Sequence, residues 1–333
     1  MALISPDAAG GAEQVLGMLD RALTRAGHHS VVVAAEGSVV AGTLVEVRRR
    51  EAANSYADWA EAHDAQRAAV ARALASHPVD VLHFHGFDFL NYLPDTDLPT
   101  LVTLHLPPGW YPPEVFALRR RNLQLHCVSR SQHRACPAGA PLGPDIENGI
   151  PLERFAVEVP RGDHAVALGR ICPEKGFDRA LEAAHHAGCG LRLAGRVFPY
   201  DAHLEYFRQA IAPRLDEQRR YVGPIGPERK ARLLAAARCL LVPSLAPETS
   251  SLVAMEALAA GTPVIAFRTG ALPEIVEHGV TGFVVEDVAS MADAIGEVGN
   301  LDPAACRRAA RARFSMSRMT GRYLARYREL AAA

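Results

Sequence analysis

The sequence predicts an α/β fold with two doubly wound domains, each built on a parallel sheet. Short apolar runs of strand length alternate with helix-like runs in both halves of the 333-residue chain. A passage rich in proline and glycine, residues 137–160, separates the two halves. The chain is also long enough for two domains that each bury a core of their own. Strands that alternate with helices favour a parallel sheet with ligands at the carboxyl ends of the strands.

The first half contains five strand-like runs and two long helix-like runs. The second helix-like run is rich in alanine and stops at Pro78, which cannot continue a helix. The expected strands are Ala2–Ile4, Ser30–Ala35, Val79–His85, Thr100–His105 and Leu125–Ser129, and the expected helices are Gly11–Ala26 and Tyr56–His77.

The second half repeats this alternation and ends in a tail, Phe314 to Leu330, with large apolar residues at helical spacing. Its expected strands are His164–Gly169, Leu191–Gly195, Tyr221–Gly223, Cys239–Val242, Pro263–Phe267 and Gly282–Val285. Its expected helices are Gly176–Ala187, Ala202–Ile211, Pro227–Ala237 and Ser251–Ala260.

Composition is typical of a soluble globular protein, with 49% hydrophobic and 22% charged residues. A net charge of −1 argues against a nucleic-acid-binding protein. No apolar run approaches the roughly 18 residues of a transmembrane helix. The six cysteines are scattered without a C-x-x-C pair, which favours buried free thiols in a reducing compartment. Because a strand begins almost at residue 1, leaving no room for a signal peptide, we expect a cytoplasmic protein.

Two carboxylates, Glu248 and Glu256, lie eight positions apart, the first before and the second inside a short apolar helix. The segment Thr249–Ser251 supplies N-cap residues, and Gly261 stops the helix. A helix N-terminus that opens from a strand presents free N–H groups and a positive dipole end, which suit a phosphate. Carboxylates are better acceptors for sugar hydroxyls. The pattern therefore predicts a site for a nucleotide-sugar.

Arg170 and Lys175 follow the strand that ends at Gly169 and bracket the start of the next helix. Two cations in this position can hold a diphosphate, although spacing alone also fits a solvated surface pair. Asp95-Thr96-Asp97 lies in a proline-bounded loop, so no Asp-x-Asp metal motif accompanies them. With two cations and a helix dipole to stabilise a leaving diphosphate, we expect no metal requirement.

Three histidines, His83, His85 and His105, lie on two neighbouring expected strands. His83 and His85 share a face of their strand, but two histidines without a third ligand make a weak case for zinc. His105 ends its strand just before the turn at 107–109, where a cleft opens in α/β folds. His105 could therefore contact a ligand in that cleft, or it could be a packed histidine at the end of a strand.

Gly10 and Gly11 lie between the first strand and the first helix, where glycine lets backbone approach a phosphate. Glu36 ends the second strand, as a carboxylate for an NAD ribose would. Residues 8–13 lack the G-x-G-x-x-G spacing, however, so NAD binding is disfavoured. The arginine clusters at 48–50 and 119–121 fit solvated faces.

Together these motifs resemble those of the retaining glycosyltransferases of the GT-B fold, specifically family 4. Glu248 and Glu256 are similar to the Glu-x7-Glu signature of that family, although members commonly carry Phe-Gly at Ser250-Ser251. The resemblance extends over most of the chain and takes in Gly10–Glu13, Val102–His105, Val128–Arg130, Asn148–Ile150, Gly169–Arg170, Lys175–Gly176 and Gly270–Gly282.

The resemblance implies two Rossmann-like domains facing a central cleft. Residues 1–155 would form the acceptor domain and residues 156–312 the nucleotide-sugar domain, while residues 313–333 would form a helix packing back on the first domain. The implied catalytic residues are His105, Glu248, Arg170 and Lys175. The implied donor-binding residues are Gly10, Gly11, Ile225, Ser250, Ser251, Leu252 and Glu256.

The implied function is that of a retaining hexosyltransferase, which moves a sugar from a nucleotide-diphosphate sugar to a small soluble acceptor without metal or cofactor. Glu248 would hold sugar hydroxyls, Glu256 the ribose, and the backbone of Ile225 the base. Two alternatives stay open: a nucleotide-sugar epimerase or phosphorylase on the same fold, and a catalytically silent nucleotide-sugar binding protein. Neither nucleic acid nor a transmembrane segment is implied.

Overall fold

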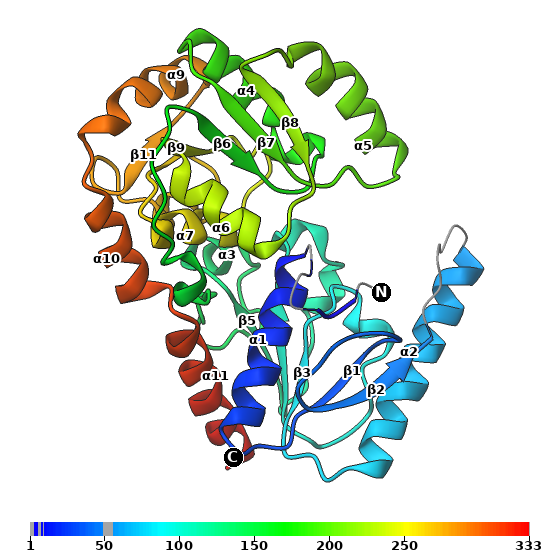
Figure 1. The fold of residues 1–333 in the computed structure, drawn as a ribbon. Helices are drawn as coiled ribbons and strands as arrows, with labels where there is room; N and C mark the ends of the chain where they lie inside the picture. The colour runs from blue at the N-terminus through cyan, green and yellow to red at the C-terminus, as the bar shows by residue number, and fades with distance from the viewer. Residues whose placement is uncertain (1–2, 6–7, 9, 49–55, 333) are drawn as a thin grey trace. The chain divides into compact units, whose positions relative to one another are not determined.

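The protein is described by a computed structural model that covers residues 3–5, 8, 10–48 and 56–332. The chain folds into two compact units (Figure 1). One comprises Met1–Glu147 and Met319–Ala333, and the other Asn148–Arg318. All strand pairs in both units are parallel. The predicted α/β class with parallel sheets is therefore confirmed, whereas the central cleft stays a prediction.

The first unit contains two parallel sheets. In the larger sheet β4 lies between β3 and β5, and in the smaller one β1 pairs with β2. Every residue of β4 is buried, as expected for a central strand covered on both faces. The strands are β1 (Val31–Ala35), β2 (Thr43–Val47), β3 (Leu82–Phe84), β4 (Thr100–Leu104) and β5 (Leu123–Cys127).

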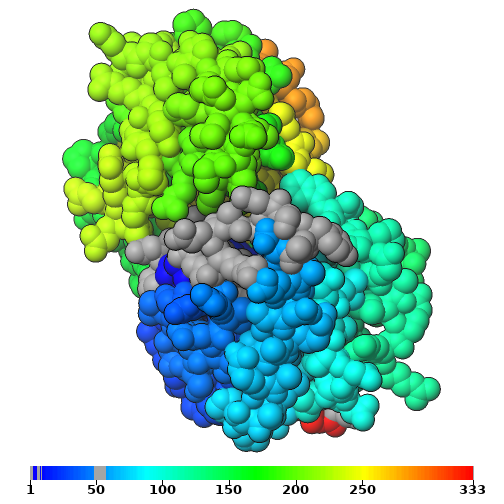
Figure 2. Space-filling view, turned by 90° about the vertical axis from the view of Figure 1, so that its right-hand side faces the viewer, coloured from blue at the N-terminus to red at the C-terminus, as the bar shows by residue number. Residues whose placement is uncertain are grey.

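Helices surround these sheets. The long helix α2 buries Gln66, Ala69, Val70 and Ala73, which recur at three- and four-residue spacing and so share one face. Its other faces form much of the surface of the first unit that Figure 2 shows. The helices of this unit are α1 (Gly11–Arg25), α2 (Tyr56–Ser76), α3 (Arg130–Ala135) and most of α11 (Met316–Ala331).

The first unit differs from the sequence predictions mainly in four strands, one of which was expected at Val79–His85 but spans only Leu82–Phe84. Leu3 and Ile4 form no strand, although the Ile4 carbonyl accepts a hydrogen bond from Val39 N at 2.8 Å; Ala2 lies outside the described residues. Strand β2 was not predicted, although its segment Thr43–Val47 is rich in the β-branched and apolar residues typical of a strand. The strand expected at 125–129 spans 123–127, because Ser129 instead caps α3.

The second unit has one six-stranded parallel sheet with the order β11-β10-β9-β6-β7-β8. The chain runs outward from β6 to β8 and then returns to place β9 on the other side of β6. The order therefore reverses between β6 and β9. The strands are β6 (Ala165–Leu168), β7 (Leu191–Ala194), β8 (Arg219–Gly223), β9 (Cys239–Val242), β10 (Val264–Phe267) and β11 (Gly282–Val285).

Alternating residues of these strands enter two cores, one on each face of the sheet, because successive side chains point in opposite directions. Leu240 and Val242 of β9 join one core, and Cys239 and Leu241 the other. Helices α4 and α9 cover one face and α6, α7 and α10 the other (Figure 1). The helices are α4 (Phe177–His186), α5 (Asp201–Tyr206), α6 (Pro227–Ala236), α7 (Leu252–Ala260), α8 (Leu272–Ile275), α9 (Val288–Glu297) and α10 (Pro303–Arg313).

The unit boundaries fall at other positions than the predicted 155 and 312. Ile150 N donates to the Phe314 carbonyl at 2.8 Å, and Phe155 is buried in a core of the second unit. Residues 148–155 therefore fold with the second unit. Residues 319–333 fold with the first, where the hydroxyl of Tyr327 lies 2.6 Å from His83 Nδ1. Within the described part of the chain, no helix combines the length and apolarity needed to cross a bilayer.

Candidate active site

The strongest candidate site lies at the carboxyl ends of β6 and β9 in the second unit. In open α/β sheets, ligands bind where the strand order reverses, which here is between these two strands. The predicted residues Arg170 and Lys175 follow β6, and Glu248 follows β9. The fold therefore brings two segments that are more than 70 residues apart in sequence to the same edge of one sheet.

Glu248 is held between two donors. Lys175 Nζ and Ser244 Oγ each lie 2.5 Å from its Oε1 atom. The Glu248 side chain is 11% exposed and that of Lys175 30% exposed, so the pair is partly shielded from water and stronger than a surface ion pair. Ser244 was not predicted from the sequence. Its position four residues before Glu248, directly after a buried strand, is the signal that could have found it.

Two glycines let the surrounding loops approach closely. Gly176 adopts a left-handed conformation, with φ of 60°, and a Cβ there would clash with the Pro243 carbonyl. Leu245 N also donates to the Glu174 carbonyl at 2.9 Å, which joins the β6 and β9 loops. Gly270 has φ of 51°, and a Cβ there would clash with the backbone of Glu248. The backbone around Glu248 is thus fixed from both sides.

The N-terminus of α7 opens beside Glu248. Ser251 is the buried N-cap residue, but its side chain makes no capping hydrogen bond among the described residues. The first backbone bond within the helix runs from Met255 N to the Ser251 carbonyl, so the N–H groups of Leu252 to Ala254 precede the helical ladder. Ser250 Oγ is buried and has no partner in the described structure. Donors and a positive dipole end with no side-chain cap suit an anion.

Glu256 lies inside α7 and is 4% exposed. Lys230 Nζ, on α6, donates to its Oε1 atom at 2.5 Å. Burial raises the pKa of the Glu256 carboxyl, and the charge of Lys230 opposes that rise. Lys230 was not predicted from the sequence, because a lysine 26 residues before its partner gives no local signal. The donor-binding role predicted for Glu256 therefore involves a carboxylate that already has a cationic partner.

Two other predicted residues of the second unit lie in exposed or half-exposed loops. Arg170 is exposed, and no ion pair to it occurs among the described residues. Burial, followed by the positive charge of Arg170, lowers the pKa of His203. Burial opposes the lowering of the Glu174 pKa, which comes from hydrogen bonds to its own backbone and to Cys172, with a smaller contribution from Arg170. Ile225 is half-buried in the loop between β8 and α6. Arg170 is thus available to a ligand from solvent.

In the first unit, His105 directly follows β4 and forms part of a cluster of four histidines. Its Nε2 atom lies 3.0 Å from His85 Nδ1. Burial, followed by the nearby His126, lowers the pKa of His105 to about 3, so its ring is neutral near neutral pH. The backbone N–H groups of His105 and Leu106 both donate to the Tyr111 hydroxyl, at 2.9 and 3.2 Å. This bond fixes the turn that follows His105.

Two of the other histidines, His83 and His126, contact Thr103. Its Oγ1 atom lies 2.6 Å from both His83 Nε2 and His126 Nε2. The rings of His83 and His85 lie 4.0 Å apart, in agreement with their predicted common face. His85 Nε2 is buried and has no hydrogen-bond partner among the described residues. Thr103 and His126 were not predicted as members of this cluster.

Gly10 and Gly11 begin α1, with Gly10 as the N-cap residue. The Glu13 carboxylate occupies the space where a Cβ at Gly10 would lie. The open approach to a phosphate that the two glycines predicted is therefore filled by an anionic side chain in this structure. A phosphate could approach Gly10 only after the Glu13 side chain turned away.

Two family models match consecutive parts of the chain. One, described as glycosyl transferases group 1, matches residues 162–300, and the other, described as glycosyltransferase family 4, matches residues 9–139. A glycogen synthase of Mycobacterium tuberculosis is 38% identical over 178 residues, which are 50% of this chain and 42% of the relative. A D-inositol 3-phosphate glycosyltransferase of Mycolicibacterium smegmatis is 32% identical over 215 residues, 62% of this chain and 49% of the relative. The chain thus spans about half the length of the curated relatives it matches.

Solved structures with the same fold match nearly the whole chain. Sucrose-phosphate synthase from Thermosynechococcus elongatus superposes with a TM-score of 0.82 at 21% identity, covering 100% of this chain and 96% of that one. The Anabaena protein HepE, solved in complex with UDP and glucose, superposes with a TM-score of 0.74 at 17% identity, covering 98% and 97%. At these identities the likeness shows the fold alone.

The close approach at Gly270 leads to a testable stability difference. We expect Gly270→Ala to destabilise the protein by about 1–2 kcal/mol for its left-handed backbone and by about 1–3 kcal/mol more for the clash with Glu248. Gly279→Ala is the matched control, because Gly279 also has a positive φ of 77° but open space around it. The free energy of unfolding in urea is measured for both variants. Equal losses of stability would contradict the prediction, because they would show that the Glu248 loop moves away from a Cβ at position 270 without destabilising the protein.

The histidine cluster predicts a pH dependence of stability. Burial lowers the pKa of His105 to about 3 and that of His126 to about 4, and it also lowers those of His83 and His85. The unfolded chain therefore binds more protons than the folded one between about pH 6.5 and pH 4. Stability should fall as pH drops through this window, by up to about 1.4 kcal/mol per pH unit for each histidine.

His126→Gln should make the fall of stability with pH less steep, because one fewer histidine takes up a proton on unfolding. The measurement is the free energy of urea unfolding between about pH 7 and pH 5. Replacement of the exposed His28 by glutamine is the control and should leave the slope as in the wild type. A slope that His126→Gln leaves unchanged would contradict the cluster as the source.

Proposed function

Because the chain belongs to the group 1 glycosyltransferases, we propose that it is a retaining hexosyltransferase that transfers a sugar from a nucleotide-diphosphate sugar to a small soluble acceptor. The observation that carries this proposal is the grouping of Glu248, Lys175 and the uncapped N-terminus of α7 at one edge of the second sheet. An anionic diphosphate and a polyhydroxylated sugar are the two chemical groups that this combination suits together.

In the proposed donor complex, the diphosphate accepts hydrogen bonds from the first N–H groups of α7 and from Ser250 Oγ. Arg170 and Lys175 add positive charge as the leaving phosphate becomes more negative in the transition state. Binding of this kind stabilises the departing group without a metal ion. Gly10 and Gly11 contribute to phosphate binding only when the Glu13 side chain turns aside.

Glu248 is proposed to accept hydrogen bonds from sugar hydroxyls. Lys175 and Ser244 both contact Oε1, so they fix the orientation of the carboxylate and direct its second oxygen to a ligand. Glu256, buried against Lys230, is proposed to bind the ribose hydroxyls, and the backbone at Ile225 the base.

Retention of configuration is proposed to follow from a same-face substitution. The departing phosphate takes the proton of the acceptor hydroxyl, while the new glycosidic bond forms on the face from which the phosphate leaves. His105 is proposed to hydrogen-bond the reacting sugar as a neutral imidazole, consistent with its low pKa. The acceptor is proposed to bind the first unit.

Assays can distinguish sugar transfer from the alternatives, which are an epimerase or phosphorylase and a catalytically silent binding protein. An epimerase would convert the donor without an acceptor, and a phosphorylase would depend on inorganic phosphate. A silent binding protein would bind donor but neither transfer nor slowly hydrolyse it. The relatives are named for synthase and transferase activities, which favours transfer.

Glu248→Gln tests the sugar contact. The amide replaces one of the two acceptor oxygens by a donor, so transfer efficiency should fall about 10–100-fold, the equivalent of a charged hydrogen bond. Nucleoside diphosphate, which lacks the sugar, should bind nearly as in the wild type by calorimetry. Glu286→Gln, which removes one partner of an exposed ion pair in the same unit, should change neither quantity. Equal losses for diphosphate and nucleotide-sugar would refute the assignment.

Metal independence is tested by the response to Mg²⁺ and Mn²⁺. Enzyme dialysed against a chelator should transfer sugar at the same rate with and without either ion, because side chains and a helix terminus stabilise the leaving diphosphate. Steady-state rates over a range of ion concentrations are the measurement. Activity that appears only when Mg²⁺ or Mn²⁺ is added would contradict the proposal.

A further inference from the structure

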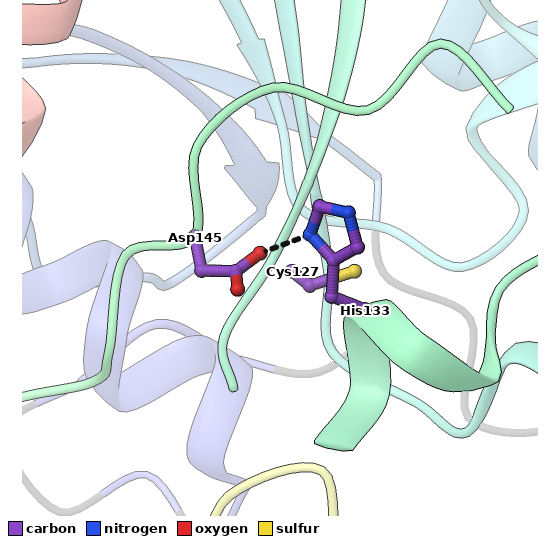
Figure 3. Close-up of side chains that lie close together, drawn as sticks. All are labelled: Cys127, His133 and Asp145. Atoms are coloured by element: carbon purple, nitrogen blue, oxygen red, sulfur yellow. Dashed lines mark hydrogen bonds and ion pairs between the residues drawn. The ribbon is translucent and has the colours of Figure 1, made fainter. Parts of the chain in front are cut away.

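Four side chains that bind metals in other proteins gather at the carboxyl end of β5 in the first unit. Cys127 ends β5, His133 lies on α3, Cys136 directly follows α3, and Asp145 lies in the next loop. Figure 3 shows Cys127, His133 and Asp145 side by side. The proposed transfer reaction uses none of them.

Three of these side chains, those of Cys127, His133 and Asp145, lie at distances that fit a single ion. One ligand atom each of Cys127, His133 and Asp145 lies within 4.8 Å of the others. His133 Nδ1 and Asp145 Oδ1 are 2.6 Å apart, and the sulfur atoms of Cys127 and Cys136 are 3.6 Å apart. Tetrahedral zinc with Zn–S bonds of about 2.3 Å separates two thiolates by about 3.8 Å. A disulfide would need about 2.05 Å, and all six cysteines are free thiols here.

Regular elements and backbone bonds hold these residues in place. Ser129 caps α3 by accepting a hydrogen bond from Gln132 N at 3.1 Å. Cys136 N donates to the His133 carbonyl at 3.1 Å, which sets the two ligands one turn apart. Ile146 N donates to the Cys127 carbonyl at 3.0 Å and so anchors the loop that carries Asp145. The ligand positions are thus largely preformed, a condition for a structural site.

Without an ion, the cluster satisfies itself through short polar contacts. The bond to Cys136, followed by burial, raises the pKa of the Cys127 thiol, whereas the same bond lowers the pKa of Cys136. One thiol proton therefore lies between the two sulfur atoms, and either sulfur can be its donor. A bound divalent cation would replace this proton, because a coordinated thiol is deprotonated outright. The thiol protons would pass to solvent, and His133 would bind through a neutral ring nitrogen.

We propose that Cys127, His133 and Asp145 bind one zinc ion in a structural site of the first unit, and that Cys136, whose sulfur lies 3.6 Å from that of Cys127, turns toward the ion as the fourth ligand. Two sulfur ligands, one nitrogen and one oxygen make up the four-coordinate set that zinc accepts. A reversible disulfide between Cys127 and Cys136 is the rival, but it would need an oxidant and would leave the neighbouring His133–Asp145 pair without a role.

A second cluster, Cys172, Glu174 and His203, is less favourable for a cation. The positive charge of Arg170 acts on both Glu174 and His203, in addition to burial and, for Glu174, hydrogen bonds, and the same charge would repel a bound cation. The Asp145 carboxylate of the first cluster pairs with His133, and no arginine among the described residues forms an ion pair with it. Arg322 donates instead to the backbone carbonyl of Asp145.

The proposed zinc site would also fix the segment around His105. Gln132, next to His133 on α3, donates from Nε2 to the carbonyls of Leu104 and Leu106, at 2.8 and 2.9 Å. These carbonyls flank His105. An ion that tethers α3 to β5 would therefore hold the His105 turn through Gln132, without itself taking part in catalysis.

The first test uses the full chain, reduced and freed of metal, and Co²⁺ as a spectroscopic probe. We expect one Co²⁺ per chain, a thiolate-to-cobalt charge-transfer band, and d–d bands of the intensity typical of tetrahedral cobalt. Zn²⁺ should displace the cobalt and raise the melting temperature. Absence of the charge-transfer band would overturn the proposal, as would a Cys127–Cys136 disulfide found by mass spectrometry in protein purified under reducing conditions.

The second test uses His133→Asn and Asp145→Asn, with His63→Asn as the control. His63 forms a comparable pair with Asp88, at 3.1 Å, in the same unit. Each cluster variant should weaken Zn²⁺ binding at least 10–100-fold in competition with a chromogenic chelator. The His63 variant should bind as the wild type does. Equal Zn²⁺ affinity in all three variants would show that the ion binds elsewhere.

Discussion

The second unit is organised around one carboxylate, Glu248, held by Lys175 and Ser244 where the strand order reverses. This ion pair constrains its surroundings, because a lysine from the β6 loop can reach a glutamate from the β9 loop only if both loops approach closely. Gly176 and Gly270 permit that approach, since any side chain at either position would clash with backbone. The same packing leaves the N-terminus of α7 without a side-chain cap. Structural requirements and the requirements of an anion site thus coincide.

A second carboxylate, Glu256, illustrates how a buried charge is tolerated. Burial alone would favour its neutral form, and Lys230 restores part of the preference for the charged form. Such a pair contributes little net stability, but losing one partner leaves an uncompensated charge and is costly. Stability alone therefore does not account for the pair, which fits the proposed role of Glu256 in binding the ribose. The first unit shows the opposite strategy, in which four histidines are held neutral by burial.

Most of the fold was predictable from the sequence, because strands such as β4 and β9 are short apolar runs bounded by turns. The edges of elements were less predictable: Ser129 reads as part of a strand but caps α3. The spacing of Glu248 around a helix start predicted a ligand site, whereas Arg170 and Lys175 by spacing alone also fitted a solvated surface pair and were selected through the resemblance to the family. Lys230 and Ser244 were not, because their roles depend on tertiary contacts rather than local pattern. The cluster of Cys127, His133, Cys136 and Asp145 was not predicted for the same reason, since the spacing of these four residues matches no known metal-binding motif.

The central claim is that the diphosphate of a nucleotide-sugar binds at the N-terminus of α7, beside Lys175 and Glu248. A crystal structure of the chain with a non-hydrolysable nucleotide-sugar tests it most directly. The account predicts phosphate oxygens within hydrogen-bond distance of the N–H groups of Leu252 and Val253, with sugar hydroxyls on the Glu248 carboxylate. A diphosphate bound at any other sheet edge, with the α7 N-terminus and the Lys175–Glu248 pair left unchanged, would contradict it.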